Sequence, residues 1–435
     1  MIQRLIVLSL FVTLGAVATA DEAVEDFSLH TQVTSVTQQH ASFRSPNPPY
    51  PGPNSMASGF DEQTSLTWTF FIGRRLWHGA ELYFDPEMSG GSGFNKTTGM
   101  AAFPNAEIYR VDDPNPKWNL ARLYIKQVFA LGDAYENVPA DLGQLAGPVP
   151  VRRLTVVVGK FALNDYFDNN SFSHDPRTQF LNWALMDQAA WDYAADTRGY
   201  SVGFYVEWNE RNWSVRYASV EEPAQANQMQ MDSDWHDAHG DNLEFEYRYK
   251  VADQPGTVRV LGYQNHAQMG NYQQALAMSG TPDITATRAK GRLKTGFGLN
   301  AEQSITPSVG VFGRFGWDDG HTETWAFTEC DESLSAGVNV KGSLWQRPDD
   351  NAGAAFIYDM LSTDHRAYLA RGGVGFIIGD GQLNYAPEQV AELYYLWQVQ
   401  KTLGLSGDYQ YVINPAYNQD RGPINILSLR VHFEI

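Results

Sequence analysis

Apolar and polar side chains alternate strictly along the C-terminal segment of the chain. Every second residue from Leu427 to Ile435 is apolar, whereas the residues between them are polar or charged: Ser428, Arg430, His432 and Glu434. Successive side chains on a β-strand point to opposite faces, so this pattern predicts a strand with one apolar and one ionic face. The ionic face needs water, and the continuous apolar face needs a protein core or lipid.

The same two-faced pattern recurs along the rest of the chain, so that sixteen strands are predicted in all. The predicted strands are Ser28–Thr37, Thr64–Arg74, Ala80–Asp85, Leu120–Leu131, Leu154–Phe161, Ser201–Asn209, Asn212–Ser219, Leu243–Lys250, Thr257–Gln264, Leu293–Gln303, Gly310–Trp317, Leu334–Trp345, Ala354–Leu361, Val390–Gln400, Gly404–Tyr411 and Asn425–Ile435. Amphipathic strands in this number, separated by turn residues, are typical of a membrane barrel. The sequence therefore predicts an all-β fold with a single closed antiparallel transmembrane β-barrel of about 16 strands.

The connections between these strands are of two kinds. Tight turns rich in Gly, Pro, Asn and Asp link some strands, as at Asn209–Asn212 and Lys401–Gly404. Long loops link others, and outer-membrane barrels place such loops outside and short turns on the periplasmic side. Keeping every tight turn on one side requires an even strand number, so we interpret the strand-like segment Val374–Gly379 as part of an extracellular loop. Gly132–Arg152 must then be an unusually long periplasmic connection.

The N-terminus predicts a secretory signal peptide over residues 1–20. Arg4 supplies a positive charge, an apolar run follows, and Ala18-Thr19-Ala20 fits the small-residue cleavage pattern. The apolar run is shorter than the ~20 residues of a spanning helix, which disfavours a membrane anchor. Cleavage before Asp21 removes one base and no acid, so residues 21–435 form one barrel domain with a formal net charge of 30 − 50 = −20.

Composition excludes several classes of protein. The acidic balance argues against nucleic acid as a partner. The mean hydropathy is −0.37, and no segment after the signal is apolar enough for a spanning helix, which excludes a helical membrane protein. A barrel is not excluded, because polar residues alternate with the apolar ones on its strands. The single cysteine, Cys330, rules out an internal disulfide.

Metal-binding and catalytic motifs are weak. The loop from Asp232 to Asp241 is rich in His and Asp, which are common metal ligands. Its spacing is unspecific, so we expect an exposed loop without a metal. The chain has no G-x-S-x-G and no H-E-x-x-H motif. Carboxylates such as Glu81 and Asp85 lie on one strand face, and this spacing alone selects no glycosidase pair. We expect a protein that is not an enzyme and needs no cofactor.

Six segments of the chain resemble one known family. They are YPGPNSM from Tyr50, ELYFDPEMSGGSGF from Glu81, GKFALNDYFDNNSFSHDPRTQFLNW from Gly159, SLSAGVNVKGSLWQRPDD from Ser333, HRAYLARGGVGFIIGDG from His365 and NPAYNQDRGP from Asn414. They look like the carbohydrate-selective porins, the OprB-type family of Gram-negative outer membranes. The resemblance implies a sixteen-stranded barrel, surrounded by outer-membrane lipid and lipopolysaccharide, that passes neutral mono- or oligosaccharides by facilitated diffusion. One departure is Ile435, where many barrel proteins carry Phe.

A sugar-selective lumen needs charges of both signs beside aromatic rings, because a sugar offers hydroxyl groups and apolar ring faces. Strand alternation places acidic and basic side chains on the inner faces of two neighbouring strands, and a basic one on the next strand. The segment Asn164–Trp183 is dense in polar and aromatic residues, so we expect this loop to fold into the pore. The predicted pore-lining residues are Glu81, Asp85, Arg122, Tyr124, Lys126, Lys160, Asp165, Asp168, Arg177 and Trp183.

Three other functions stay open on the sequence. The barrel could be a general diffusion porin, since any porin lumen is charged and the charges could simply solvate the wall. It could be a binding or structural barrel, such as an adhesin or receptor, with a plugged lumen. A soluble β-sandwich lectin is the third, and its apolar faces would meet in one core. Single-channel conductance with and without sugars separates these functions. The oligomeric state, monomer or homo-oligomer, is also open.

Overall fold

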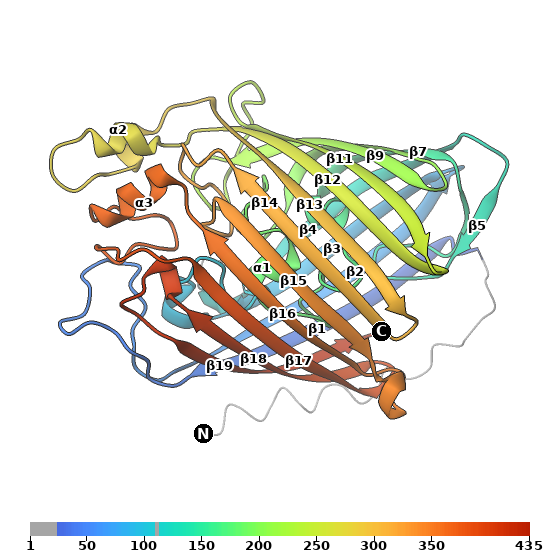
Figure 1. Ribbon diagram of the computed structural model, residues 1–435. Coiled ribbons are helices and arrows are strands. Elements are labelled where there is room, and N and C mark those ends of the chain that lie inside the picture. The colour runs from blue at the N-terminus through green and yellow to red at the C-terminus, as the bar shows by residue number, and fades with distance from the viewer. Residues whose placement is uncertain (1–23, 109–112) are drawn as a thin grey trace.

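Sixteen antiparallel strands close into a single barrel in the computed structural model, which describes residues 24–108 and 113–435 (Figure 1). The barrel strands are β1 (Phe27–His40), β2 (Asp61–Trp77), β3 (Ala80–Gly91), β4 (Asp113–Ala130), β7 (Arg153–Phe161), β8 (Ser201–Asn209), β9 (Trp213–Pro223), β11 (His239–Val251), β12 (Gln254–Ala267), β13 (Arg292–Thr306), β14 (Val309–Asp318), β15 (Glu332–Lys341), β16 (Asn351–Met360), β17 (Glu388–Gln400), β18 (Leu403–Ile413) and β19 (Ile424–Glu434). The first strand closes the barrel by pairing with both β2 and β19. The predicted fold class is confirmed.

Burial along the strands is the reverse of that in a water-soluble protein. On β19, Leu429 is 56% exposed on the outer face, whereas Arg430 is fully buried and points inward. Leu123 on β4 and Val431 on β19 are also exposed. The exposed outer face is therefore apolar and the inner face ionic, which is the arrangement that a barrel adopts in lipid.

Helices are few and short. They are α1 (Trp183–Met186), α2 (Tyr272–Leu276) and α3 (Thr363–Ala370), with single 3₁₀ turns at Phe94–Lys96, Leu163–Asp165, Thr285–Thr287, Gly342–Trp345 and Pro415–Tyr417. Among the described residues, no helix has the length and apolar character to cross a membrane.

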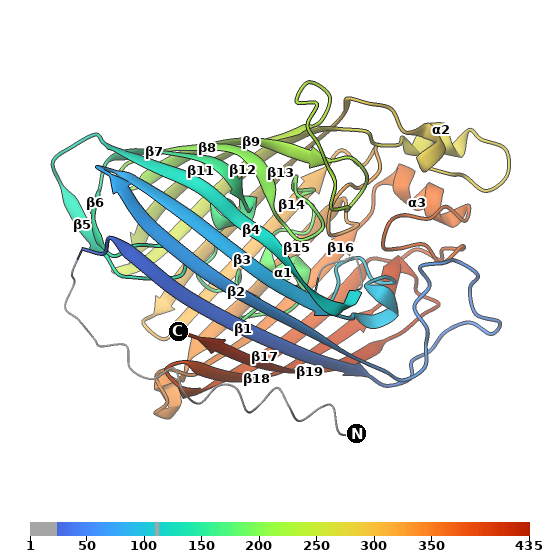
Figure 2. The ribbon, with the colours of Figure 1, turned by 180° about the vertical axis from the view of Figure 1, so that it is seen from behind.

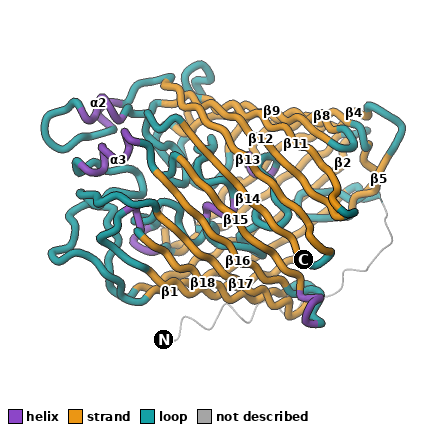
Figure 3. The backbone as a smooth tube through the Cα atoms, viewed as in Figure 1, coloured by secondary structure: helices purple, strands orange, loops and turns teal. Residues whose placement is uncertain are grey.

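Short and long connections lie at opposite ends of the barrel. Two-residue links join β2 to β3, β11 to β12, β13 to β14 and β17 to β18, and these define the turn end. The loop end carries α2 and α3, as Figure 3 shows. The segment Val374–Gly379 lies outside the strands, as predicted from the strand parity. Some strand boundaries were wrong. The strand predicted over Leu334–Trp345 ends at Lys341, where a 3₁₀ turn follows it, whereas the strand predicted over Ala80–Asp85 continues to Gly91.

The connection between β4 and β7 at the turn end is long, as expected, and it is ordered. It contains β5 (Tyr135–Val138) and β6 (Gly147–Pro150), which pair only with each other. A further two-residue strand, β10 (Met231–Asp232), pairs with the last residues of β9 at the loop end.

The β7–β8 loop, residues 162–200, folds into the barrel and carries α1 with it (Figures 1 and 2). The Leu181 amide donates to Glu392 Oε1 of β17 at 2.5 Å, and the Asp168 amide donates to Glu244 Oε2 of β11 at 2.8 Å. Inward-facing carboxylates thus satisfy buried backbone N–H groups of the loop, which would otherwise be costly to bury. The infolding predicted from the sequence is confirmed.

Two other loops also enter the barrel, which the sequence did not reveal. Gln38 and Gln410 both donate to the Pro104 carbonyl of the β3–β4 loop, at 2.9 and 2.8 Å. From the β14–β15 loop, the Trp325 amide donates to the Asp192 carboxylate at 2.9 Å. Buried Lys294 of β13 lies 3.1 Å from the same carboxylate. The space that these loops leave open lies beside β2–β4 and β7–β9.

Candidate functional site

A cavity of about 870 Å³ lies inside the barrel, and we call it the lumen cavity. Its walls come from the inner faces of β2–β4 and β7–β9, from the infolded β7–β8 loop and from the β4–β7 connection. Eight of the ten predicted residues line it: Glu81, Asp85, Arg122, Tyr124, Lys126, Asp165, Arg177 and Trp183. The strand pattern places most of these side chains, because alternate residues of each strand face inward.

Strands β3 and β4 bring acidic and basic side chains directly opposite one another. In their register, Glu81 pairs with Lys126 and Asp85 pairs with Arg122. Lys126 Nζ lies 2.9 Å from Glu81 Oε2, and Arg122 Nη1 lies 3.7 Å from Asp85 Oδ2. The sequence predicted that these two strands are neighbours, and the antiparallel register in the structure shows which residues face each other.

The infolded loop is joined to the wall by ion pairs. Arg122 donates through Nε and Nη2 to both carboxylate oxygens of Asp165, at 2.7 and 2.5 Å. Arg177 Nε lies 3.1 Å from Glu107 Oε1 of the β3–β4 loop. Two-point contacts between guanidinium and carboxylate are both strong and directional. The charges that line the lumen cavity are therefore held in fixed positions.

Aromatic rings alternate with these charges. Tyr166 stacks on Tyr205 with ring centroids 4.2 Å apart, and both rings line the lumen cavity. The guanidinium of Arg122 lies 5.2 Å from the centre of the Tyr200 ring. The Tyr200 hydroxyl donates to Glu87 Oε2 at 3.0 Å. Flat rings and fixed hydrogen-bonding groups together suit a solute that has apolar faces and hydroxyl edges.

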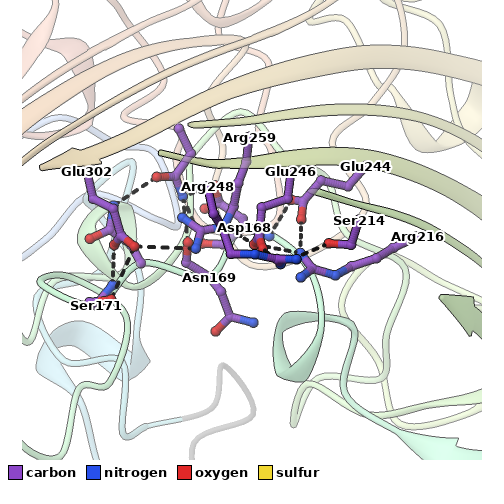
Figure 4. Close-up of polar contacts among 12 residues, drawn as sticks. Asp168, Asn169, Ser171, Ser214, Arg216, Glu244, Glu246, Arg248, Arg259 and Glu302 are labelled. Atoms are coloured by element: carbon purple, nitrogen blue, oxygen red, sulfur yellow. Dashed lines mark hydrogen bonds and ion pairs between the residues drawn. The ribbon is translucent and has the colours of Figure 1, made fainter. Parts of the chain in front are cut away.

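From β8 to β13, the inner face of the barrel wall carries a ladder of alternating charges, part of which Figure 4 shows. Arg216 on β9 contacts Glu207 on β8 at 2.8 Å and Glu244 on β11 at 2.6 Å. Arg259 on β12 continues the ladder, 2.8 Å from Glu246 and 3.4 Å from Glu302. Because each charged side chain forms an ion pair with one of opposite sign on the next strand, the ladder holds the strands of this part of the wall together. Only its first members, Glu207 and Arg216, line the lumen cavity.

Two predicted pore-lining residues are not among the residues that line the lumen cavity. Lys160 on β7 lies 3.0 Å from Asp196 of the infolded loop. Asp168, in the infolded loop, is buried 2.9 Å from Arg314 Nε of the wall, and it accepts the Gln188 amide at 2.9 Å. Both side chains are occupied in fastening the loop to the wall. Strand alternation and loop composition could not separate these fastening residues from residues that face the open space.

Several lining residues were missed, for two reasons. Glu207 alternates with Val206 and Trp208 on a predicted strand, so the same parity argument could have found it. Tyr200 and Glu107 lie on loops, where no periodic signal exists to show that they turn inward.

The infolded loop also contains a carboxyl group whose acidity is strongly shifted. Burial, with a smaller contribution from nearby Asp168, raises the pKa of Asp187 to about 8, although Arg314 acts in the opposite direction. His174 Nδ1 lies 3.8 Å from Asp187, and burial together with Arg314 lowers the pKa of that histidine. At neutral pH this part of the loop therefore carries less charge than its sequence indicates.

The described residues contain no group of three or more His, Cys, Asp or Glu side chains placed to hold a metal ion. In the loop Asp232–Asp241, the His236 side chain is 94% exposed. Cys330 is buried and unpaired with another cysteine.

Comparisons with known proteins place the chain in a family. The sequence profile of the carbohydrate-selective porins, OprB family, matches residues 57–435. The high-pH structure of Pseudomonas putida OprB aligns with a TM-score of 0.70 over 94% of each chain at 16% identity. The low-pH structure of the same porin aligns with a TM-score of 0.51 at 14% identity, over 94% of this chain and 93% of that one. No curated protein sequence matches. The chain belongs to the OprB family of carbohydrate-selective porins, and it is an outer-membrane sugar channel.

Proposed function

We propose that neutral mono- or oligosaccharides cross the outer membrane through the lumen cavity by facilitated diffusion. One observation carries this proposal: acidic, basic and tyrosine side chains line the same cavity in fixed positions. A sugar hydroxyl can donate to Glu81 or Asp165 and accept from Arg122, and a sugar ring can rest on the face of Tyr166 that is turned away from Tyr205. Each group replaces a hydrogen bond that the sugar would make with water.

The paired charges favour neutral polar solutes over ions. Arg122 and Asp165 neutralise each other at short range, so the cavity holds strong local dipoles rather than a large field of one sign. Selectivity in pores depends on such donors, acceptors and electrostatic barriers at close quarters. Binding must stay weak enough for release, and exposed hydroxyl contacts of this kind are individually worth only ~1 kcal/mol.

The chain is a channel rather than an enzyme, and we infer that it carries no covalent chemistry and needs no cofactor. The charged side chains of the lumen cavity hold one another, and the proposed passage requires only reversible hydrogen bonds. Transport then follows the sugar gradient without any coupled reaction.

The export of the chain is part of the proposal. Residues 1–20 would be removed as a signal peptide, which leaves residues 21–435 as the barrel domain in contact with lipid and lipopolysaccharide. The predicted signal lies outside the described residues. N-terminal sequencing of the protein from isolated outer membranes tests the cleavage, and a first residue other than Asp21 would correct it. Native mass spectrometry of the same sample separates monomer from homo-oligomer.

Sugar titration of the ion current tests the channel function. In a planar bilayer, a sugar that binds in the lumen cavity reduces the single-channel current in a saturable way. A general diffusion porin would show only the small loss of current that follows from lower bulk conductivity. Tyr166→Ala should weaken the saturable block, whereas Tyr249→Ala on β11, which does not line the cavity, should leave it unchanged.

A further inference from the structure

The connection between β4 and β7, residues 131–152, is out of proportion to the other connections of the turn end. Those between β2 and β3, between β11 and β12 and between β17 and β18 consist of two residues each. Closing two antiparallel strands needs no more than such a turn. The extra residues form the β5–β6 hairpin, which projects at the end of the barrel where β1 begins (Figure 2).

The hairpin is fastened to the barrel at three places. Leu145 is only 2% exposed, and its amide donates to the Tyr83 hydroxyl at 3.4 Å. The Ala146 carbonyl accepts the Glu25 amide at 3.0 Å and Arg75 Nη2 at 3.3 Å. Arg153 Nη1 lies 3.6 Å from Glu136 Oε1 at the base. A loop held by a buried apolar side chain and several hydrogen bonds has a defined position.

The tip of the hairpin lines the lumen cavity. Asp141, Leu142, Gln144 and Leu145 share this cavity with Arg122 and Asp165. Asp141 and Gln144 exchange backbone hydrogen bonds at 3.2 and 3.0 Å, which makes the tip a tight turn. Beneath the anchor, Tyr83 donates to Glu81, the partner of Lys126. The hairpin therefore borders the path on the periplasmic side of the charged pairs, because the turn end faces the periplasm in outer-membrane barrels.

We propose that the β5–β6 hairpin forms the periplasmic exit of the channel and sets the upper size of the sugars that pass. A solute that leaves the charged pairs passes the tip of the hairpin, where Asp141, Gln144 and the backbone of the turn offer further hydrogen-bonding groups. The buried Leu145 holds the tip at the edge of the path. This inference rests on the proposed passage of sugars through the lumen cavity.

The first test shortens the hairpin without disturbing its strands. Val138 and Gly147 pair directly at the end of the β5–β6 ladder, so a two-residue Asn-Gly turn can replace residues 139–146. The expected result is a several-fold rise in the liposome-swelling rate of a trisaccharide relative to a monosaccharide, together with a higher single-channel conductance in salt. Unchanged size dependence and unchanged conductance would overturn the proposal.

The ion measurement separates this inference from the proposed function. Suppose that shortening raises the conductance but neither the shortened nor the unmodified protein prefers sugars. The hairpin would then remain the exit, and sugar selectivity would be contradicted. A sugar preference that is unaffected by shortening the hairpin would support the proposed function and contradict the role of the hairpin as the exit.

The second test leaves the chain length unchanged, and it decides the matter if the shortened barrel fails to fold. Leu142→Cys places a thiol at the tip, and Asp253→Cys places one in the β11–β12 turn at the same end of the barrel. The native Cys330 is replaced by Ser in both variants. A bulky thiol reagent should lower the conductance of Leu142→Cys several-fold and leave that of Asp253→Cys unchanged. Equal responses of the two variants would overturn the proposal.

Discussion

The guanidinium of Arg122 and the carboxylate of Asp165 form a two-point ion pair, with both donor–acceptor distances at or below 2.7 Å. Arg122 belongs to the barrel wall and Asp165 to the infolded loop, so this contact helps to hold the loop against the wall. The same pair lines the lumen cavity. Positioning of the loop and chemistry of the pore therefore depend on the same two side chains.

Arg122→Ala should weaken sugar binding and shift ion selectivity together. The substitution removes the one ion-pair partner that Asp165 has among the described residues, and it leaves Asp85 without its arginine. The lumen becomes more negative, so cation selectivity should rise. The loss of a hydrogen-bonding partner should reduce sugar binding by about 1–3 kcal/mol. Reversal potentials and sugar titration of the current measure the two effects.

Arg152→Ala is the matched control for that substitution. Arg152 also forms a two-point pair with a carboxylate, Glu210, at 2.6 and 2.9 Å, but it lies at the turn end with a side chain that is 52% exposed. The control should conduct and bind sugar as the unmodified protein does. Equal shifts in both variants would mean that net charge, rather than the geometry of the lumen cavity, controls selectivity.

Asp168→Ala should loosen the infolded loop. Arg314 is buried and has Asp168 as its carboxylate partner at 2.9 Å, so the substitution leaves a buried cation without its counter-charge. Breaking such a pair costs about 3–5 kcal/mol. The expected results are faster protease cleavage within residues 162–200 and a noisier open-channel current. The exposed pair of Arg152 and Glu210 offers a control, since Glu210→Ala should change neither measurement. A quiet channel in Asp168→Ala would contradict the fastening role.

Stability should fall as the pH rises from acid toward pH 8, in part because of Asp187. Its pKa is about 8 in the folded protein and ~3.9 in an unfolded chain. Between these values the folded state binds more protons than the unfolded state, so the free energy of unfolding falls with increasing pH. The stabilisation by protonated Asp187 is complete below the pKa of the unfolded state, and it is lost as the pH rises through the pKa of the folded state.

Asp187→Asn tests this assignment. The amide cannot ionise, so urea unfolding in lipid vesicles should depend less on pH over that window than it does for the unmodified protein. Asp253→Asn, which changes an exposed carboxylate of a turn, is the control. An unaltered pH slope in Asp187→Asn would show that the carboxyl group ionises normally inside the barrel.

Leu429→Arg should impair insertion of the barrel. Leu429 lies on the exposed apolar face, opposite Thr37 of β1 and Gly407 of β18. A positive charge near the middle of the lipid-facing surface costs about 2–4 kcal/mol. Folding yield into vesicles, read from heat-modifiable migration in gels, measures this cost. Leu429→Ala should insert almost normally, and equal yields for the two variants would reverse the assignment of the faces.

The strands were predictable because their signal is local. On β19 the alternation between Leu427 and Phe433 directly reports which face meets lipid. Strand parity also correctly assigned Val374–Gly379 to a loop, since an extra strand there would have moved the tight turn at Lys401–Gly404 to the wrong end of the barrel. The error at Leu334–Trp345 arose where the apolar pattern continued past Lys341 into a 3₁₀ turn.

The lumen cavity was predictable only in part because loops form much of its wall. Glu81, Asp85, Arg122 and Lys126 follow from strand alternation and antiparallel pairing. The placement of loop residues depends on contacts between distant segments, such as Asp168 with Arg314, which no periodic pattern encodes. The composition of Asn164–Trp183 indicated that the loop enters the pore, but it did not indicate which of its side chains face the open space.

Liposome swelling tests the central claim most directly. Vesicles that contain the purified protein are exposed to equal gradients of a neutral monosaccharide and of a zwitterionic amino acid of similar size. Passage governed by hydrogen bonds in the lumen cavity predicts faster swelling with the sugar, and a clear loss of this preference in Arg122→Ala but not in Arg152→Ala. Equal rates for the two solutes in the unmodified protein, with no change in Arg122→Ala, would contradict sugar selectivity and leave a general diffusion pore.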